Sequence, residues 1–220
     1  MKLAIFDFDG TLYKNETFPL LMKHLKEHTT YGPRYKGLYR SVLVPYISYK
    51  LKMYPERKMK MQMMQKYLRA FSGLTETELD EYFAEIANKM RDDFNQDVFS
   101  RLHKHNKDNF HTMIVSGAFT PLLKSVAKDV PVDTIIGTDV PLMEGFYDPK
   151  MPIDHVQAER KTELVHDKMN NESIDWENSF AYGDSYSDLF VLKLVGNPVA
   201  VSPDEKLREV AIQNKWEIIE

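Results

Sequence analysis

The sequence predicts an α/β protein with an open parallel sheet and a helical cap domain inserted after the first strand. Short apolar runs recur along the chain, and most of them stop at Asp, Ser or Gly. Segments with helical start signals alternate with these runs, as in a parallel sheet covered on both faces. Residues 17–100 break this alternation, because their sequence pattern is helical throughout. The segment is too long to be an ordinary connection between two strands.

The first strand is expected at residues 2–7, where four apolar residues follow one another without a polar interruption. A continuous apolar run of this length is typical of a strand buried on both faces. Further strands are expected at residues 113–115, 134–136, 180–182 and 199–201.

Helices are expected to begin at four capping residues. Thr17 can cap a helix that carries an apolar stripe, and Thr75 forms a capping box with Glu78. Thr120 precedes a proline at the first helical position, and Ser202 combines the same signal with a capping box. We therefore divide the chain into an α/β core, residues 1–16 and 101–220, and a helical cap, residues 17–100.

The composition excludes several classes of protein. The 220 residues contain no cysteine, which excludes disulfide scaffolds, cysteine nucleophiles and zinc–thiolate sites. The net charge of −4 is too small to suggest a nucleic-acid partner, and no apolar run reaches the roughly 18 residues of a membrane span. Asp7 and Asp9 interrupt the only early apolar stretch, so we expect no signal peptide and a cytoplasmic location.

Acidic side chains follow two of the expected strands. Asp7 and Asp9 come after the first, and Asp184 and Asp188 follow the one at residues 180–182. Ligands of open parallel sheets bind beyond the carboxyl ends of the strands, and carboxylates that converge there need a cation. Mg²⁺ suits such oxygen ligands. Taken singly each Asp is more simply a turn or cap residue, so the prediction depends on the combination.

The ordered motifs resemble the haloacid dehalogenase superfamily of phosphohydrolases, a resemblance that spans almost the whole chain. Asp7-Phe8-Asp9-Gly10-Thr11-Leu12 looks like the first signature of that superfamily, and Gly183-Asp184-Ser185-Tyr186-Ser187-Asp188 looks like the fourth. Ser116, before Gly117, resembles the second signature and Lys161 the third. The insert after the first signature and the tail at 197–204 resemble the phosphoserine-phosphatase-like branch.

The resemblance implies a Rossmann-like core and a phosphatase that acts on a small phosphorylated metabolite through an aspartyl-phosphate intermediate. Asp7 would be the nucleophile and Asp9 the general acid and base. Asp7, the backbone carbonyl of Asp9 and the side chain of Asp184 would bind Mg²⁺, with Asp188 holding a ligand or bound water in place. The phosphate would be bound by Ser116, Gly117 and Lys161. A phosphotransferase with the same intermediate is an alternative.

The substrate is less well specified. Glu16 matches a glutamate that contacts the amino group of the substrate in phosphoserine phosphatases, although it can equally start the cap helix. The arginine that binds the substrate carboxylate in phosphoserine phosphatases has no exact counterpart here, a first departure from them. Its place falls near Tyr67, with Lys66 and Arg69 beside it. Gly10 stands where phosphoserine phosphatases typically carry serine, and this departure weighs against phosphoserine itself.

Residues 31–69 form a basic segment with ten Lys and Arg side chains and one acid, Glu56, interleaved with tyrosines and methionines. We expect a helix pair with Tyr and Met in its core and lysines in water. As an alternative, the chain is a non-catalytic protein that binds an anionic surface through this segment. A homodimer could cover an exposed Tyr/Met face. No nucleic-acid partner is expected. The nearby His103, His105 and His111 are expected in a solvated loop.

Overall fold

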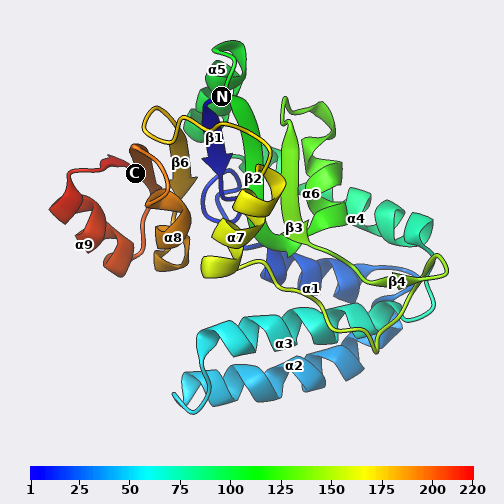
Figure 1. The fold of residues 1–220 in the computed structure, drawn as a ribbon. Helices are drawn as coiled ribbons and strands as arrows, with labels where there is room; N and C mark the ends of the chain where they lie inside the picture. The colour runs from blue at the N-terminus through cyan, green and yellow to red at the C-terminus, as the bar shows by residue number, and fades with distance from the viewer.

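The structure, a computed structural model that describes residues 1–220, has the α/β architecture that the sequence predicts (Figure 1). All pairings in the main sheet are parallel, in the order β3-β2-β1-β6-β7-β8. The order reverses between β1 and its neighbour β6, and this switch point is where ligands bind in such sheets. The strands are β1 (Leu3–Phe6), β2 (His111–Phe119), β3 (Thr134–Thr138), β6 (Phe180–Gly183), β7 (Asn197–Val201) and β8 (Glu217–Ile219).

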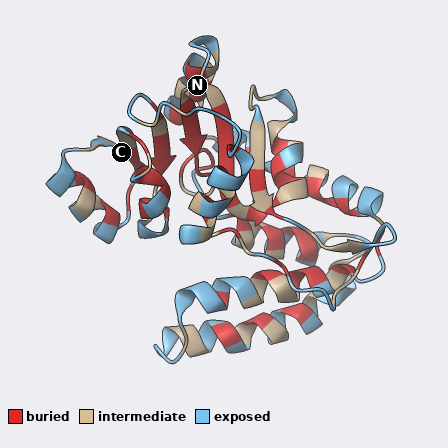
Figure 2. Cartoon of the chain, viewed as in Figure 1, coloured by how far each residue is buried: buried red, intermediate tan, exposed pale blue.

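Helices cover both faces of the sheet, which explains the uninterrupted apolar strand sequences. Successive residues of β1 point to opposite faces, so that Phe6 joins one hydrophobic cluster and Ile5 the other. Figure 2 shows the strands largely in the buried class. One cluster includes residues of α5 (Gln96–Lys107) and α6 (Thr120–Val126), and the other includes residues of α7 (Glu159–Lys168), α8 (Leu189–Leu192) and α9 (Glu205–Asn214).

The insert after β1 is helical, with α2 and α3 side by side as a hairpin that stands away from the sheet (Figure 1). Its hydrophobic interior is continuous with that of the sheet, because Tyr67 and Phe83 place their ring centroids 6.1 and 5.5 Å from that of Phe119. The insert is therefore packed onto the core as part of one cluster. Its helices are α1 (Thr17–Glu27), α2 (Tyr35–Lys50), α3 (Glu56–Leu68) and α4 (Glu76–Met90).

A short antiparallel hairpin ties a loop of the core to the insert. Its strands are β4 (Leu142–Met143) and β5 (Phe146–Tyr147), and Tyr147 N donates to Leu74 O at 2.8 Å. Neither this hairpin nor β8 was predicted, because strands of two or three residues are too short to show a periodic pattern. None of the helices is both long and apolar enough to cross a membrane.

One predicted cap is confirmed. Thr75 accepts a hydrogen bond from Glu78 N at 3.2 Å, and the Glu78 carboxylate accepts from Thr75 N at 2.8 Å, which completes the capping box of α4. The prediction for Thr17 is wrong in detail. Thr17 is the first residue of α1, and its hydroxyl donates to the carboxylate of Asp9 instead of capping the helix.

The other two caps are also assigned differently. The hydroxyl of Thr120 donates to Asp139 Oδ1 at 2.6 Å and leaves α6 without a side-chain cap. The cap of α9 is Asp204, which accepts from Leu207 N at 2.8 Å, and Ser202 lies before the helix. A sequence signal locates a helix start to within a few residues, whereas tertiary partners decide which hydroxyl is free to cap.

The expectation of a solvated histidine loop is wrong. His103 and His105 lie in α5, and His111 begins β2. His105 is buried, and its Nε2 lies 2.8 Å from the Tyr182 hydroxyl. Burial lowers the pKa of His105 to about 4, so that the ring is neutral at physiological pH.

Candidate active site

Asp7 stands at the switch point of the sheet. Its backbone N donates to Tyr182 O at 2.9 Å, which extends the pairing of β1 with β6 by one residue and fixes where the Asp7 side chain begins. Asp184 follows β6, the neighbouring strand. Carboxylate oxygens of Asp7, Asp184 and Asp188 all lie within 4.8 Å of one another. Residues that are about 180 positions apart in the sequence therefore meet at one edge of the sheet.

The turn after Asp9 can approach Asp184 only because it contains glycine. Gly10 has a φ of +72°, and a Cβ at this position would collide with Asp184 Oδ2. Both the left-handed backbone and the close approach exclude a side chain here. Gly10 thus lets the loop after β1 and the loop after β6 close against each other.

Lys161 on α7 is the cation of the cluster. Its Nζ lies 2.6 Å from Asp7 Oδ1 and 2.6 Å from Asp188 Oδ1. Burial by itself lowers the pKa of Lys161, but the charges of Asp188 and Asp7 outweigh burial and hold the pKa above its ordinary value. The second carboxylate oxygen of Asp188 accepts from Ser185 N at 3.2 Å and Ser185 Oγ at 3.0 Å. Lys161 is therefore a buried ammonium fixed between two carboxylates.

A strained residue sets the start of α7. Ala158 has a φ of 48° and a ψ of −128°, a conformation that residues with a Cβ rarely adopt. Strain of this kind costs on the order of 1–3 kcal/mol and persists where the surrounding structure imposes it. It lies three residues before Lys161, at the entry of the helix that carries the ammonium into the site.

Ser116 and Gly117 lie in an irregular part of β2. The register with β3 shifts between Val115 and Phe119, so these residues leave the regular ladder. The hydroxyl of Thr138 donates to Gly117 O at 2.8 Å and holds the bulge. A Cβ on Gly117 would come 2.9 Å from His155 Nε2, so glycine is needed here for the close approach of that ring.

The acidic groups carry more negative charge than one lysine balances. Burial and the charge of Asp188 raise the pKa of Asp7 to about 6, against the opposing effect of Lys161. Burial raises the pKa of Asp9 to about 7, although the hydrogen bond from Thr17 lowers it. Burial and the charges of Asp7 and Asp188 raise the pKa of Asp184 to about 9. Oxygen ligands in excess of positive charge are the donor set that fits a hard divalent cation.

Of the three predicted substrate contacts, one is buried in the structure and two are exposed. Tyr67 is completely buried, and its hydroxyl donates to Leu21 O at 3.2 Å and lies 2.7 Å from the Tyr82 hydroxyl. Protein partners thus satisfy the Tyr67 hydroxyl in this structure, and its assignment as a substrate contact stays a prediction. Arg69 is exposed, and its charge acts on Tyr147 of the β4–β5 hairpin. Glu16 is exposed and directly precedes α1.

Two residues near the site were not singled out from the sequence. Burial lowers the pKa of Lys60, but the charges of Glu16, Glu56 and Asp9 raise it by more, which places this α3 side chain within electrostatic reach of the site. His155 has a buried Nδ1 without a hydrogen-bond partner, and burial lowers its pKa to about 4. Lys60 was counted only as part of the basic segment, and nothing in the local sequence marks His155.

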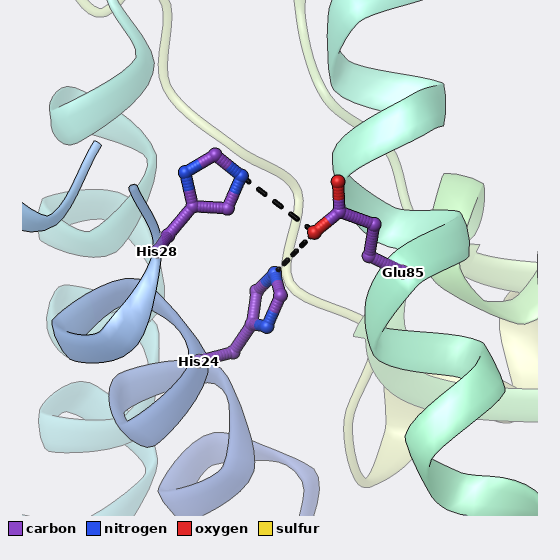
Figure 3. Close-up of side chains that lie close together, drawn as sticks. All are labelled: His24, His28 and Glu85. Atoms are coloured by element: carbon purple, nitrogen blue, oxygen red, sulfur yellow. Dashed lines mark ion pairs between the residues drawn. The ribbon is translucent and has the colours of Figure 1, made fainter. Parts of the chain in front are cut away.

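His24, His28 and Glu85 have the composition of a metal site, but both histidine rings carry a hydrogen on the nitrogen that would have to bind the metal (Figure 3). His24 Nε2 and His28 Nε2 lie 3.4 and 3.6 Å from Glu85 Oε2. His28 Nδ1 accepts from two backbone N–H groups, and His24 Nδ1 lies 2.8 Å from Lys89 Nζ, which can only donate. The Nδ1 atoms are thus the acceptors, so that both Nε2 atoms carry hydrogen. We interpret the group as a polar link between α1 and α4.

Comparisons with known proteins identify the family and its relatives. The family model described as haloacid dehalogenase-like hydrolase matches residues 4–193. A phosphoserine phosphatase of Mycobacterium tuberculosis is 29% identical over 97 residues, which is 44% of this chain and 32% of that protein. A Streptomyces azureus protein named for inhibition of morphological differentiation is 25% identical over 163 residues, or 73% of this chain and 58% of that protein. The chain thus spans about a third of the length of the first of these curated relatives.

Solved structures show the same fold. A Bordetella pertussis protein of unknown function superposes with a TM-score of 0.82 at 18% identity, covering 100% of this chain and 98% of that one. A phosphoserine phosphatase with an analogue of the phospho-aspartyl intermediate gives a TM-score of 0.64 at 17% identity, with coverage of 99% and 92%. At these identities the likeness establishes the fold and not the substrate.

Proposed function

Because the chain belongs to the haloacid dehalogenase-like hydrolase family, we propose that it is a Mg²⁺-dependent phosphatase that hydrolyses small phosphomonoesters through an aspartyl phosphate on Asp7. The observation that carries the proposal is the position of Lys161 Nζ, 2.6 Å from both Asp7 and Asp188, beside the carboxylate of Asp184. In this arrangement a buried carboxylate is held next to fixed positive charge, as attack on a phosphate dianion requires.

In the first step a carboxylate oxygen of Asp7 attacks phosphorus and the bond between phosphorus and the ester oxygen breaks. The leaving alkoxide takes a proton from Asp9, so that the products are an alcohol and Asp7 acyl phosphate. Burial raises the pKa of Asp9 to about 7, which leaves a substantial protonated fraction at neutral pH. The hydrogen bond from Thr17 orients that carboxyl group.

In the second step water attacks phosphorus of the acyl phosphate. Asp9, now ionised, accepts a proton from the water, and the bond between phosphorus and Asp7 breaks. Inorganic phosphate leaves, and both aspartates return to their starting protonation states. The Lys161 ammonium, the Ser116 hydroxyl and the Gly117 amide bind the phosphoryl oxygens in both steps, which places donors where negative charge accumulates.

Asp7, Asp184 and the backbone carbonyl of Asp9 would hold Mg²⁺, while Asp188 would orient a ligand or bound water through its hydrogen bonds. When bound, the ion supplies positive charge that neutralises the phosphoryl oxygens and the crowded carboxylates. Burial and the charges of Asp7 and Asp188 raise the pKa of Asp184 to about 9, which supports this assignment because a bound cation would offset those neighbouring charges.

We keep the division into a core, residues 1–16 and 101–220, and a cap, residues 17–100, as part of the proposal. Lys60 Nζ pairs with Glu56 Oε1 at 3.2 Å, and the charge of Glu16 also raises the pKa of Lys60, so Glu16 and Lys60 would offer opposite charges to a substrate. A leaving group with both a cationic and an anionic substituent would match this pair. A small zwitterionic phosphomonoester is therefore the substrate class that we propose.

The test is release of inorganic phosphate from an aryl phosphate, measured with Mg²⁺ and with a chelator. Asp7→Asn should abolish turnover, because an amide cannot form the acyl phosphate. Asp80→Asn, which removes an exposed carboxylate of α4, is the matched control and should retain full turnover. Turnover that survives in Asp7→Asn, or that is independent of added metal, would refute the proposal.

Product analysis in the presence of acceptor alcohols separates hydrolysis from transfer. A phosphatase releases inorganic phosphate whatever alcohol is present. If a phosphorylated alcohol accumulates in place of inorganic phosphate, the same aspartyl phosphate serves a phosphotransferase. Trapping of the phosphoryl group on Asp7, detected by mass spectrometry, is expected in either case.

A further inference from the structure

The outward face of α2 carries apolar side chains that no part of the chain covers. Val44, Ile47 and Leu51 are 65%, 46% and 64% exposed. They follow one another at i, i+3 and i+7 and so form one stripe along the helix. The stripe continues at the hairpin turn, where Met53 is 76% exposed.

The opposite face of the same helix is already used. Leu38, Val42 and Pro45 are buried, and α2 packs on α3 through this inner side. Figure 1 shows α2 as the outer helix of the hairpin, with α3 between it and the rest of the molecule. A helix that is apolar on two sides is normally buried on both, which means that the outer stripe of α2 lacks its partner.

Cations flank this stripe and have no acidic partners. Lys36 and Arg40 precede it on the same outer face, and Lys50 and Lys52 lie at its end. None of these four side chains forms an ion pair. Residues 28–55 contain no Asp or Glu, although the whole chain has a net charge of −4. The charge of the molecule is therefore strongly polarised toward the hairpin.

We propose that the outer face of α2 docks onto an anionic lipid surface. Aliphatic side chains on one stripe with Lys and Arg beside them are the pattern of a helix that lies in the membrane interface. The polarised charge would turn the hairpin toward an anionic bilayer and the acidic remainder of the chain away from it. A second copy of the chain fits less well, because a two-fold contact would bring the same unpaired cations together.

The experiment is sedimentation of the full chain with vesicles of phosphatidylcholine, with and without phosphatidylglycerol, at low and high salt. Binding is expected only to vesicles that contain phosphatidylglycerol and should weaken at high salt. Two triple variants test the two components: Val44→Ser, Ile47→Ser, Leu51→Ser for the stripe, and Arg40→Gln, Lys50→Gln, Lys52→Gln for the cations. The second should lower the partition coefficient roughly a hundredfold.

The matched control removes the same number of exposed cations elsewhere, with Lys124→Gln, Lys128→Gln and Lys168→Gln, and should bind nearly as well as the wild type. Circular dichroism and aryl phosphate turnover check that each variant is folded. The proposal is wrong if the wild type binds no better to vesicles that contain phosphatidylglycerol than to those that lack it. It is also wrong if the control loses as much binding as the cation variant. A concentration-dependent dimer that only the stripe variant abolishes would assign this face to a second copy.

Discussion

The ammonium of Lys161 lies 2.6 Å from the carboxylate of Asp7, and both side chains are buried although 154 positions separate them in the sequence. A third group, Asp188, shares the same ammonium at the same distance. One cation thus links Asp7, which follows β1, to the loop that follows β6. Its removal should affect the chemistry and the folding of the site together.

Lys161→Met should lower turnover of an aryl phosphate by about a hundredfold to a thousandfold, because a fixed donor to the phosphoryl group is lost. The metal-free protein should also lose about 3 kcal/mol of unfolding free energy, since two buried carboxylates lose their partner. Lys168→Met on the same helix is exposed and should change the unfolding free energy by no more than about 0.5 kcal/mol. Equal effects of the two substitutions in urea titrations and turnover assays would contradict the role of Lys161.

The stability of the metal-free protein should fall as the pH rises through the neutral range. Burial raises the pKa of Asp9 to about 7, and burial with neighbouring carboxylates raises that of Asp184 to about 9, from 3.8 in each case. Between these values the folded state binds more protons than the unfolded state, so the free energy of unfolding decreases with increasing pH. Mg²⁺ should therefore raise the melting temperature more at pH ~8.5 than at pH ~5.5.

Thermal unfolding in chelator and in Mg²⁺ at both pH values checks this expectation. Asp184→Asn should flatten the pH dependence of the metal-free protein and reduce the increase that Mg²⁺ produces. An increase in melting temperature that is the same at both pH values would show that the ion does not compete with protons for these carboxylates.

His105 should have the opposite effect on stability at lower pH. Burial lowers its pKa from 6.5 to about 4, so between these values the unfolded state binds the extra proton and stability falls as the pH falls. The full shift corresponds to about 3 kcal/mol. His105→Gln should remove this component from the difference between unfolding free energies measured at pH ~7 and pH ~4.5.

His103→Gln is the control for this measurement, because His103 lies on the same helix and is only partly buried. The pH dependence of the control should match that of the wild type. If His105→Gln keeps the wild-type slope, the neutral, buried histidine beside Tyr182 is not the source of the acid sensitivity.

Gly10→Ala should disrupt the site, whereas the same change at Gly73 should be mild. Both glycines have a positive φ, +72° and +78°, but only at Gly10 would a Cβ meet another residue, Asp184. Gly73→Ala is expected to cost about 1 kcal/mol from the backbone alone. Gly10→Ala should cost more in urea unfolding and also reduce Mg²⁺-dependent turnover, and comparable effects at the two positions would argue against the close approach to Asp184.

The sequence alone determined the class of the fold and the acidic residues that gather at one edge of its sheet. Continuous apolar runs that end in Asp7 and Asp184 require a sheet covered on both faces with carboxylates at one edge, and the structure has that sheet. These features depend on the local order of residue types, which is visible in the chain itself. The capping box of Thr75 could be predicted for the same reason.

Only the tertiary structure decided which side chains are free to act. Tyr67 is packed between helices, Thr17 bonds to Asp9 instead of capping a helix, and the charges of Glu16, Glu56 and Asp9 raise the pKa of Lys60. The exposed stripe of α2 likewise became visible only when its other face was found buried against α3. Burial and partnership are properties of contacts between remote segments, and a local pattern does not contain them.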